Sequence, residues 1–431
     1  MSLAFSICLI TLLITASIGM PIAFAMIVSA VVYLAIAGQD LALASEQLIQ
    51  SVYDSFVLLA VPLFIVAANI MNAGAISDRL LEFCKAMVGR FKGGMAQVDI
   101  LVSLIFSGMS GSAVADAAGV GKISIRMMLK TGHYTPGFAG AVVAASATIG
   151  PIIPPSIPMV LYALVSDASI GYLFLGGVVP GLLMTLVLMT MNSVIAHKRN
   201  IPAEEAVPLR KIPGVTLRAL PALMMPVILL AGIYGGATTP TEAAAVAAAY
   251  ALIVSGVFYR SLTIRSLYEV FLDSARSSAS VGLVIGSALI FNYIVATENI
   301  PAALQTLLVS LDLSRAEFLI FVNLLFLALG CVLDATTIIL VIIPLFLPTV
   351  RALGIDPVHF GVVAVVNCMI GLITPPYGML LFVINGTTGI PIKAIVREGY
   401  PFLFALLIAL ACLTAFPGLV LGLPRLFGYE G

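Results

Sequence analysis

Charged residues are spaced so widely along this chain that most of its length must lie in a membrane. Lys and Arg together number 20, and Asp and Glu together number 20, among 431 residues, whereas roughly a quarter of the residues of a soluble domain are charged. Hydrophobic residues make up 61% of the chain, so a water-soluble surface cannot be formed. We therefore predict an all-α polytopic membrane protein, which excludes a soluble enzyme.

The remaining composition excludes further classes of protein. The formal net charge is zero and no basic stripe occurs, which removes the electrostatic basis for binding nucleic acid. The five cysteines are scattered without a CxxC pair, so neither a metal cluster nor a disulfide framework is indicated. We expect no cofactor, and the lipid bilayer is the partner that composition itself identifies.

The intervals between charged residues locate the membrane helices, because about 20 apolar residues span the bilayer core. Residues 1–39 accommodate two short helices, interrupted at Gly19-Met20-Pro21. Six intervals suit one crossing each: 55–77, 168–197, 219–241, 243–259, 277–297 and 399–424. Two intervals are too long for one straight helix, 131–166 and 357–392, and three are too short, 100–115, 318–333 and 335–350.

Both overlong intervals contain a proline-rich break near their midpoint. Residues 148–156 read TIGPIIPPS and residues 369–377 read MIGLITPPY. Proline removes a backbone donor and clashes with the preceding turn, and unwound backbone at membrane depth requires protein or a polar cavity around it. One such break could be a simple kink, but two breaks of similar sequence favour a functional role. We predict broken helices over about 133–163 and 357–385.

The short intervals predict two re-entrant helical hairpins, over about 95–130 and 316–351. The first tip, FSGMSGSA over residues 106–113, consists of small residues suited to a tight turn and a nearby ligand. The second tip contains Asp334, with 16 uncharged residues before it and 16 after it. Burying this carboxylate alone would cost several kcal/mol, so it requires a cation, helix N-terminal amides or water. A structural N-cap on the returning helix is the simpler alternative.

The two hairpins belong to an internal repeat. A spacing of 222 residues superposes Gly108 on Gly330, and a spacing of 221 superposes Gly150 on Gly371 together with the Pro-Pro pairs that follow them. We predict a first repeat over residues 1–217 and a second over 218–431. Each repeat has the order hairpin, linker, broken helix and final crossing.

Lysine and arginine placement predicts that the repeats are inverted. Basic residues concentrate in 79–92, 122–130, 198–218 and 260–276, whereas the connections 40–54, 167, 235–242 and 298–312 contain acids and no Lys or Arg. Basic connections face the cytoplasm, so the first hairpin enters from inside and the second from outside. The expected fold has about ten transmembrane helices plus two re-entrant helical hairpins in two inverted-topology repeats, with both termini outside.

Inverted repeats with broken helices are typical of secondary transporters that bind their cargo at mid-membrane. Freed carbonyls and hydroxyls offer hard oxygen ligands to Na⁺, and half-helix N-termini attract an anion. The predicted first cation site comprises Ser107, Ser110, Gly111, Ser112, Gly150 and Pro151. The second comprises Gly330, Asp334, Thr336, Gly371 and Thr374. The predicted anion contacts are Ser112, Pro154, Pro155, Ser156, Thr337, Pro375 and Pro376.

Two charged segments are predicted to be amphipathic helices. Ile76, Leu80, Phe83, Met87 and Phe91 recur at helical spacing in the first segment, and Leu267, Val270 and Phe271 in the second. Such helices lie in the membrane interface or brace a moving domain. Passive anchoring is the alternative for both.

The sequence resembles the large membrane (M) subunit of tripartite ATP-independent periplasmic (TRAP) transporters over nearly its whole length. The resemblance rests on the hairpin tip over 107–112, the first break over 148–156, the Thr239–Ala243 turn and the second break over 374–378. It implies Na⁺-driven uptake of a small carboxylate by an elevator-type movement, with Na⁺ bound at the two clusters named above. It also implies a multi-pass location in the bacterial inner membrane.

The same resemblance implies two protein partners. One is a small four-helix membrane subunit (Q type), expected as a separate chain because this sequence starts directly with the large subunit. The other is a periplasmic substrate-binding protein (P type). The short external connections agree with this, because none could fold into a ligand-binding domain, and no P-loop occurs to hydrolyse ATP. The sequence does not decide between C4-dicarboxylates, sialic acid, other sugar acids and keto acids.

Two other functions remain open at this point. A stand-alone sodium/dicarboxylate symporter would share the hairpin architecture without a binding protein. An intramembrane serine protease is the distant alternative, because residues 108–111 read GMSG around Ser110. A serine nucleophile needs a base within hydrogen-bond reach, and the three histidines, His133, His197 and His359, lie near predicted helix ends. A channel is less consistent with hairpins that meet broken helices.

Overall fold

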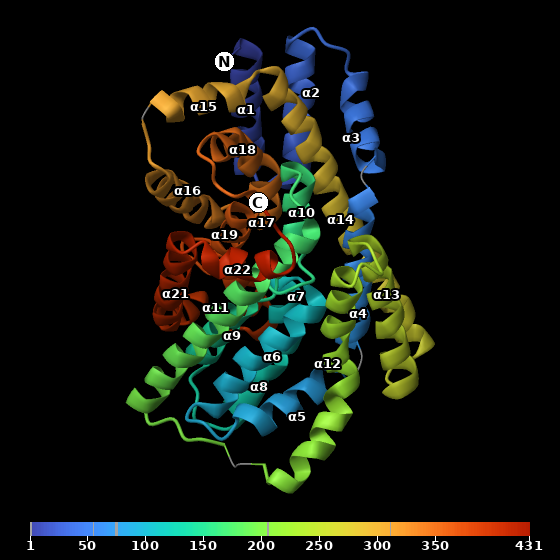
Figure 1. Ribbon diagram of the computed structural model, residues 1–431, viewed down its shortest axis with the longest axis vertical. Helices are drawn as coiled ribbons and strands as arrows, with labels where there is room; N and C mark the ends of the chain where they lie inside the picture. Colours follow the sequence, from blue (N-terminus) through green and yellow to red (C-terminus); the bar gives the residue numbers. More distant parts are fainter. Residues whose placement is uncertain (1, 55, 74–75, 205–206, 311) are drawn as a thin grey trace.

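The computed structural model describes residues 2–54, 56–73, 76–204, 207–310 and 312–431. Within these residues the secondary structure is helical, and no β-strand is formed. Figure 1 shows an elongated helical bundle with α1 and α15 at one end and α5 and α8 toward the other. The predicted all-α class is confirmed.

Uninterrupted apolar helices form much of the bundle. The first two, α1 (Leu3–Ser17) and α2 (Ile22–Ile36), are separated at Gly19 and Pro21 as predicted. The longer ones are α11 (Ile170–Lys198), α12 (Ile212–Tyr234), α13 (Pro240–Ile253) with the π-helix η3 (Val254–Phe258), α14 (Ile264–Thr297) and α21 (Ile392–Ala415). A short 3₁₀ turn, η2 (Leu209–Lys211), precedes α12. The predicted boundary between the repeats, 217/218, falls inside α12, and the division into repeats stays a prediction.

Six helices in the described part of the chain are long and apolar enough to cross a membrane, and the bent pair α4 (Ala60–Ala73) and α5 (Ile76–Val88) would make a seventh. One of the six, Ala335–Ala352, is the returning arm of the second hairpin. The ten crossings expected from the sequence would be reached only if α1, α2, the bent pair and the two broken helices also cross, and that number stays a prediction. Each half of a broken helix is too short to be counted among the six long apolar helices.

Helices occupy both predicted hairpins. The first consists of α6 (Gly94–Ser110), α7 (Ala113–Ala118) and α8 (Val120–Lys130). The second consists of α16 (Arg315–Gly330), α17 (Ala335–Thr337), the π-helix η4 (Ile338–Ile342) and α18 (Ile343–Ala352).

Both proline-rich segments unwind. The first separates α9 (Pro136–Ala147) from α10 (Ile157–Ser166), and the second separates α19 (Pro357–Gly371) from α20 (Met379–Thr388). The bonds Pro154–Pro155 and Pro375–Pro376 are cis. Since proline cannot donate the backbone hydrogen bond that continues a helix, each segment ends one half-helix, and a new one begins beyond it.

Two connections and one predicted crossing differ from the sequence interpretation. The stretch 40–54 contains α3 (Ala42–Asp54), followed by η1 (Phe56–Leu59), and 298–312 contains α15 (Ile300–Ser310). Acidic residues marked these stretches as connections, but Glu46 stays exposed on α3 without interrupting it. The interval 399–424 is not one helix, because α21 ends before Pro417 and α22 (Gly418–Leu426) follows; proline breaks the helix there.

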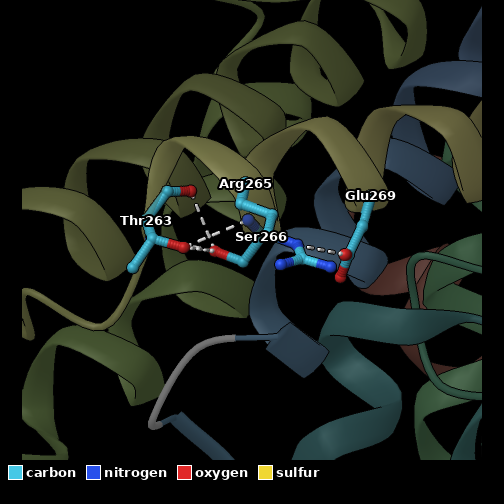
Figure 2. A network of polar contacts seen from close by, with 4 residues as sticks. All are labelled: Thr263, Arg265, Ser266 and Glu269. Atoms are coloured by element: carbon cyan, nitrogen blue, oxygen red, sulfur yellow. Dashed lines mark hydrogen bonds and ion pairs between the residues drawn. The ribbon is translucent and has the colours of Figure 1, made fainter.

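The two amphipathic segments differ from each other. The first is the separate helix α5, which buries Ile76 and Leu80. The second is not a separate helix but the beginning of α14, which continues to Thr297. Figure 2 shows its start, where the Thr263 hydroxyl accepts the Ser266 N–H at 3.1 Å and Arg265 binds Glu269 at 3.3 Å. The cap is reciprocal, because the Ser266 hydroxyl also accepts the Thr263 N–H at 2.8 Å. It begins one continuous helix that includes both the predicted amphipathic segment and the predicted crossing over 277–297.

The two halves of the chain interlock around the unwound segments. Helix α10, which follows the first break, packs against α17 and η4 of the second hairpin. Helix α20, which follows the second break, packs against α7 and α8 of the first hairpin. Each hairpin therefore contacts a half-helix from the other half of the chain, and the two hairpins and two broken helices pack together.

Candidate functional site

The tip of the first hairpin lies directly on the first unwound segment. Gly111 ends α6 with φ 59°, a left-handed conformation that glycine adopts without strain. A Cβ atom at Gly111 would lie 2.5 Å from the carbonyl oxygen of Pro155. Ser112 then caps α7 by accepting the Ala115 N–H at 3.4 Å. The tip and the break, which both contribute residues to the first predicted site, therefore lie together.

A buried carboxylate that the sequence interpretation did not select lies at this contact. Asp116, on α7, is 3% exposed, and its Oδ1 accepts a hydrogen bond from the Ser110 hydroxyl. Its Oδ2 is buried without a hydrogen-bond partner, and a Cβ atom at Gly150 would lie 2.3 Å from that oxygen. Only glycine at position 150 leaves room for the carboxylate. Ser110, Asp116 and Gly150 form what we call the first cluster.

The hydroxyl groups of two other predicted residues in this half form hydrogen bonds to backbone groups nearby in the sequence. The Ser107 hydroxyl donates to the carbonyl of Leu104 and the Ser156 hydroxyl donates to the carbonyl of Pro151. Ser156 also caps α10 by accepting the Met159 N–H at 3.2 Å. Pro154, Pro155 and Ser156 are buried in this conformation.

The tip of the second hairpin lies on the second unwound segment in the same manner. A Cβ atom at Gly371 would lie 2.7 Å from the Cα atom of Gly330, so these two glycines bring α19 and α16 into backbone contact. The N–H of Gly378 donates to the carbonyl of Cys331 at 3.4 Å across the same junction. Both glycines had been predicted as site residues, and the structure brings them together.

Asp334 is the N-cap of α17 in this structure, which is the simpler of the two roles considered for it. Its carboxylate accepts the Thr337 N–H at 3.1 Å and the Thr337 hydroxyl. It occupies the position equivalent to Ser112, 222 residues earlier, which caps α7. Asp334 is half-buried, however, so its carboxylate stays open to a further ligand. Gly330, Asp334, Thr337 and Gly371 form the second cluster.

The remaining predicted residues of this half are more open than their counterparts. Thr336, Thr374 and Pro375 are half-buried and Pro376 is exposed. The Thr374 hydroxyl donates to the carbonyl of Ile370 at 2.8 Å. The second unwound segment is therefore the more accessible of the two.

The chemistry of the two clusters can be compared with what a cation site and a serine nucleophile each require. A carboxylate with an unsatisfied buried oxygen is costly without a counter-charge, and a cation beside Asp116 would provide one. Ser110 hydrogen-bonds Asp116, while the buried His359 lies 2.9 Å from the Leu413 carbonyl. Within the described residues no histidine is hydrogen-bonded to Ser110, as a serine nucleophile would require.

Hairpin tips that meet broken helices in an apolar bundle are the architecture expected of a multi-pass membrane transporter. Residues 9–419 match the family described as tripartite ATP-independent periplasmic transporter, DctM component. The chain therefore belongs to the DctM family of TRAP transporter large permeases. It is a transporter subunit and not an enzyme, so the protease alternative is wrong.

Individual relatives support the same assignment. The sialic acid TRAP transporter large permease protein SiaM of Vibrio cholerae is 40% identical over 413 residues, covering 95% of this chain and 96% of SiaM. The C4-dicarboxylate TRAP transporter large permease protein DctM of Pseudomonas aeruginosa is 40% identical over 375 residues, covering 87% and 88%. The solved YdaH transporter of Alcanivorax borkumensis aligns with a TM-score of 0.61 over 86% of this chain and 87% of its own, and at 16% identity it shares the fold.

Proposed function

We propose that this chain is the transporting subunit of a sodium-driven importer, located in a bacterial inner membrane, that takes up a small organic anion. The observation that carries the proposal is the first cluster, where Asp116 keeps one buried oxygen without a partner beside Gly150. A sodium ion there would neutralise the carboxylate and use hydroxyl and carbonyl oxygens as ligands. The second cluster would supply the inverted counterpart around Asp334.

The cargo is proposed to be a carboxylate. The relatives named above carry sialic acid and C4-dicarboxylates in their names, and both are small carboxylates. The helices α7, α10 and α17 have their N-termini beside the unwound segments. Helix N-termini carry partial positive charge, so Ser112, Ser156 and Thr337 are the residues that we expect to contact the anion, together with the two Pro-Pro pairs.

The transport movement is proposed to be of the elevator type. Each half-helix beyond a break packs on the hairpin of the other repeat, so the two clusters are expected to move as one body. The uninterrupted helices, including α2, α4, α13 and α14, would form the scaffold. A small four-helix subunit and a periplasmic substrate-binding protein are proposed as partners because the family is tripartite.

Uptake should require both a sodium gradient and the binding protein. The experiment uses proteoliposomes that contain this chain with its small membrane subunit, and labelled succinate and sialic acid as probes. Accumulation is expected only when Na⁺ is higher outside and the binding protein is present. Accumulation without the binding protein would favour the stand-alone symporter, and accumulation unchanged by replacing Na⁺ with K⁺ would contradict sodium coupling.

Replacing Asp334 by Asn should weaken sodium dependence more than folding. Asparagine is as good an N-cap as aspartate, so the bond from the Thr337 N–H can persist while the charge is lost. We expect the Na⁺ concentration for half-maximal uptake to rise at least roughly fivefold, which is the lower end of the usual range of coupling factors. Thermal unfolding should stay near that of the wild type. Unchanged Na⁺ stimulation in a well-expressed variant would limit Asp334 to its capping role.

A further inference from the structure

A second buried carboxylate lies in the first hairpin, away from the tip. Asp99, on α6, is 1% exposed, and its Oδ2 accepts a hydrogen bond from the Ser146 hydroxyl of α9 at 2.8 Å. The Ser124 hydroxyl of α8 is buried without a hydrogen-bond partner of its own and lies next to the same carboxylate. Three helices therefore direct oxygen atoms toward one place inside the hairpin domain.

No cation in the described residues neutralises Asp99. The helices α4 and α9, which pack against α6, contain no charged residue. The charged groups of the other packed helices form no ion pair with Asp99; Arg79 pairs with Glu82 and Lys85 with Glu204. Asp99 is joined to the first cluster through the end of α9, because Ser146 donates to Asp99 and Gly150, four residues later, lies against the Oδ2 atom of Asp116. The full set on α5, α7, α8, α11 and α12 is Asp78, Arg79, Glu82, Lys85, Asp116, Lys122, Arg126, Lys130, His197, Lys198 and Arg218.

The second half of the chain builds the corresponding contact without a titratable group. Asn367 of α19 donates to the Oδ1 atom of Asn323 of α16 at 2.8 Å. This is the same pair of elements, first hairpin arm and first half of the broken helix, that Asp99 and Ser146 join in the first half. An amide is neutral at every pH, whereas a carboxyl group can change its charge. The architecture thus tolerates a neutral group at this contact, and the first half has a titratable one.

We propose that Asp99 is a proton-binding site whose protonation state sets the sodium affinity of the first cluster. When Asp99 is ionised, its negative charge adds to that of Asp116 and attracts the cation. When a proton occupies Asp99, that contribution is lost. By reciprocity, sodium binding at Asp116 displaces the proton from Asp99 to solvent. The inference rests on the proposed sodium site, and it adds a group that the transport proposal does not use.

The test measures Na⁺ affinity against pH in the purified chain with its small subunit, using Na⁺-induced thermal stabilisation with K⁺ as the reference ion. Such stabilisation reports binding without requiring the transported anion. For the wild type we expect the half-saturating Na⁺ concentration to fall by roughly 5- to 150-fold as pH rises across the titration of Asp99. Asp99→Asn should bind Na⁺ weakly and lose the part of the pH dependence that Asp99 contributes, which leaves only the direct competition of protons with Na⁺ at Asp116. The control Asp273→Asn changes an exposed acid on α14 and should behave as the wild type.

Two further measurements keep the proposal falsifiable if Asp99→Asn folds poorly. Ser146→Ala removes a hydrogen bond to the ionised carboxylate, which favours the protonated form, so the pH dependence should move to higher pH. Infrared spectra of the wild type should contain a protonated-carboxyl band that diminishes as Na⁺ is added. Na⁺ stabilisation whose pH dependence is unchanged in Asp99→Asn or Ser146→Ala would overturn the inference. Absence of Na⁺ stabilisation at every pH would instead overturn the sodium site itself.

Discussion

Replacing Asp116 by Asn is expected to abolish sodium-stimulated uptake. The carboxylate is buried beside Gly150, and one of its oxygens has no hydrogen-bond partner. Within the described residues, only the proposed cation would neutralise its charge. Losing one partner of a buried charge pair costs about 2–5 kcal/mol, which weakens sodium binding by roughly 30-fold or more. Labelled-succinate and sialic acid uptake, measured against Na⁺ concentration in proteoliposomes, would show this loss.

The folded state should survive the Asp116→Asn substitution. Asparagine has nearly the same shape, and it removes a charge that is costly to bury when no cation is bound. We expect the thermal unfolding temperature without Na⁺ to be unchanged or higher. Glu269→Gln is a matched control, because Glu269 lies on the exposed start of α14 (Figure 2) and pairs with Arg265. Full sodium stimulation in a folded Asp116→Asn protein would exclude Asp116 from the site.

Replacing Gly371 by Ala is expected to separate the second hairpin from the broken helix. The new methyl group would lie 2.7 Å from the Cα atom and 2.9 Å from the carbonyl carbon of Gly330. Both atoms belong to the backbone, so no side chain can rotate away. Overpacking of this kind costs about 1–3 kcal/mol, and the displaced backbone includes the second cluster. We expect lower thermal stability and at least roughly a tenfold loss of uptake, on the scale of a misplaced binding group.

Gly386→Ala provides the matched control on the neighbouring half-helix. Gly386 lies within α20, and a Cβ atom there would meet no heavy atom within 4 Å. Alanine in a helix interior is more stable than glycine by roughly 0.5–1 kcal/mol, so this variant should be as stable as the wild type or more so. Equal thermal stability and equal uptake in the two alanine variants would mean that neither property depends on the close approach of Gly371 and Gly330.

The fold could be predicted from the sequence mainly because the departures from ordinary membrane helices recur. The breaks around Gly150 and Gly371 unwind where their prolines require it, and the small residues of the first tip form the turn at Gly111. Helix α3 was missed because acids were taken to mark connections, whereas a helix can keep an acid on its exposed face. Helix α22 was missed because the interval 399–424 was defined by its charged ends alone, without regard to Pro417.

The candidate site was predicted only in part. Asp99 and Asp116 had been treated as the charged ends of the uncharged interval 100–115, although both are buried inside the hairpin domain. The spacing of these two acids in the sequence does not indicate that they are buried. Their burial depends on the packing of α9 over α6 and α8. Asp334 attracted attention for its isolation in the sequence, yet its structural counterpart is the cap residue Ser112. The partnership of Asp116 with Gly150 is a tertiary contact that only the fold reveals.

The measurement that tests sodium coupling most directly is the entry of radioactive sodium during transport. Proteoliposomes containing this chain and its small subunit would receive the loaded binding protein outside, with the Na⁺ concentration higher outside than inside. We predict that labelled sodium enters together with the anion, and that Asp116→Asn abolishes both fluxes. Accumulation of the anion without sodium entry would contradict the account, because the two clusters would then have no cation to couple.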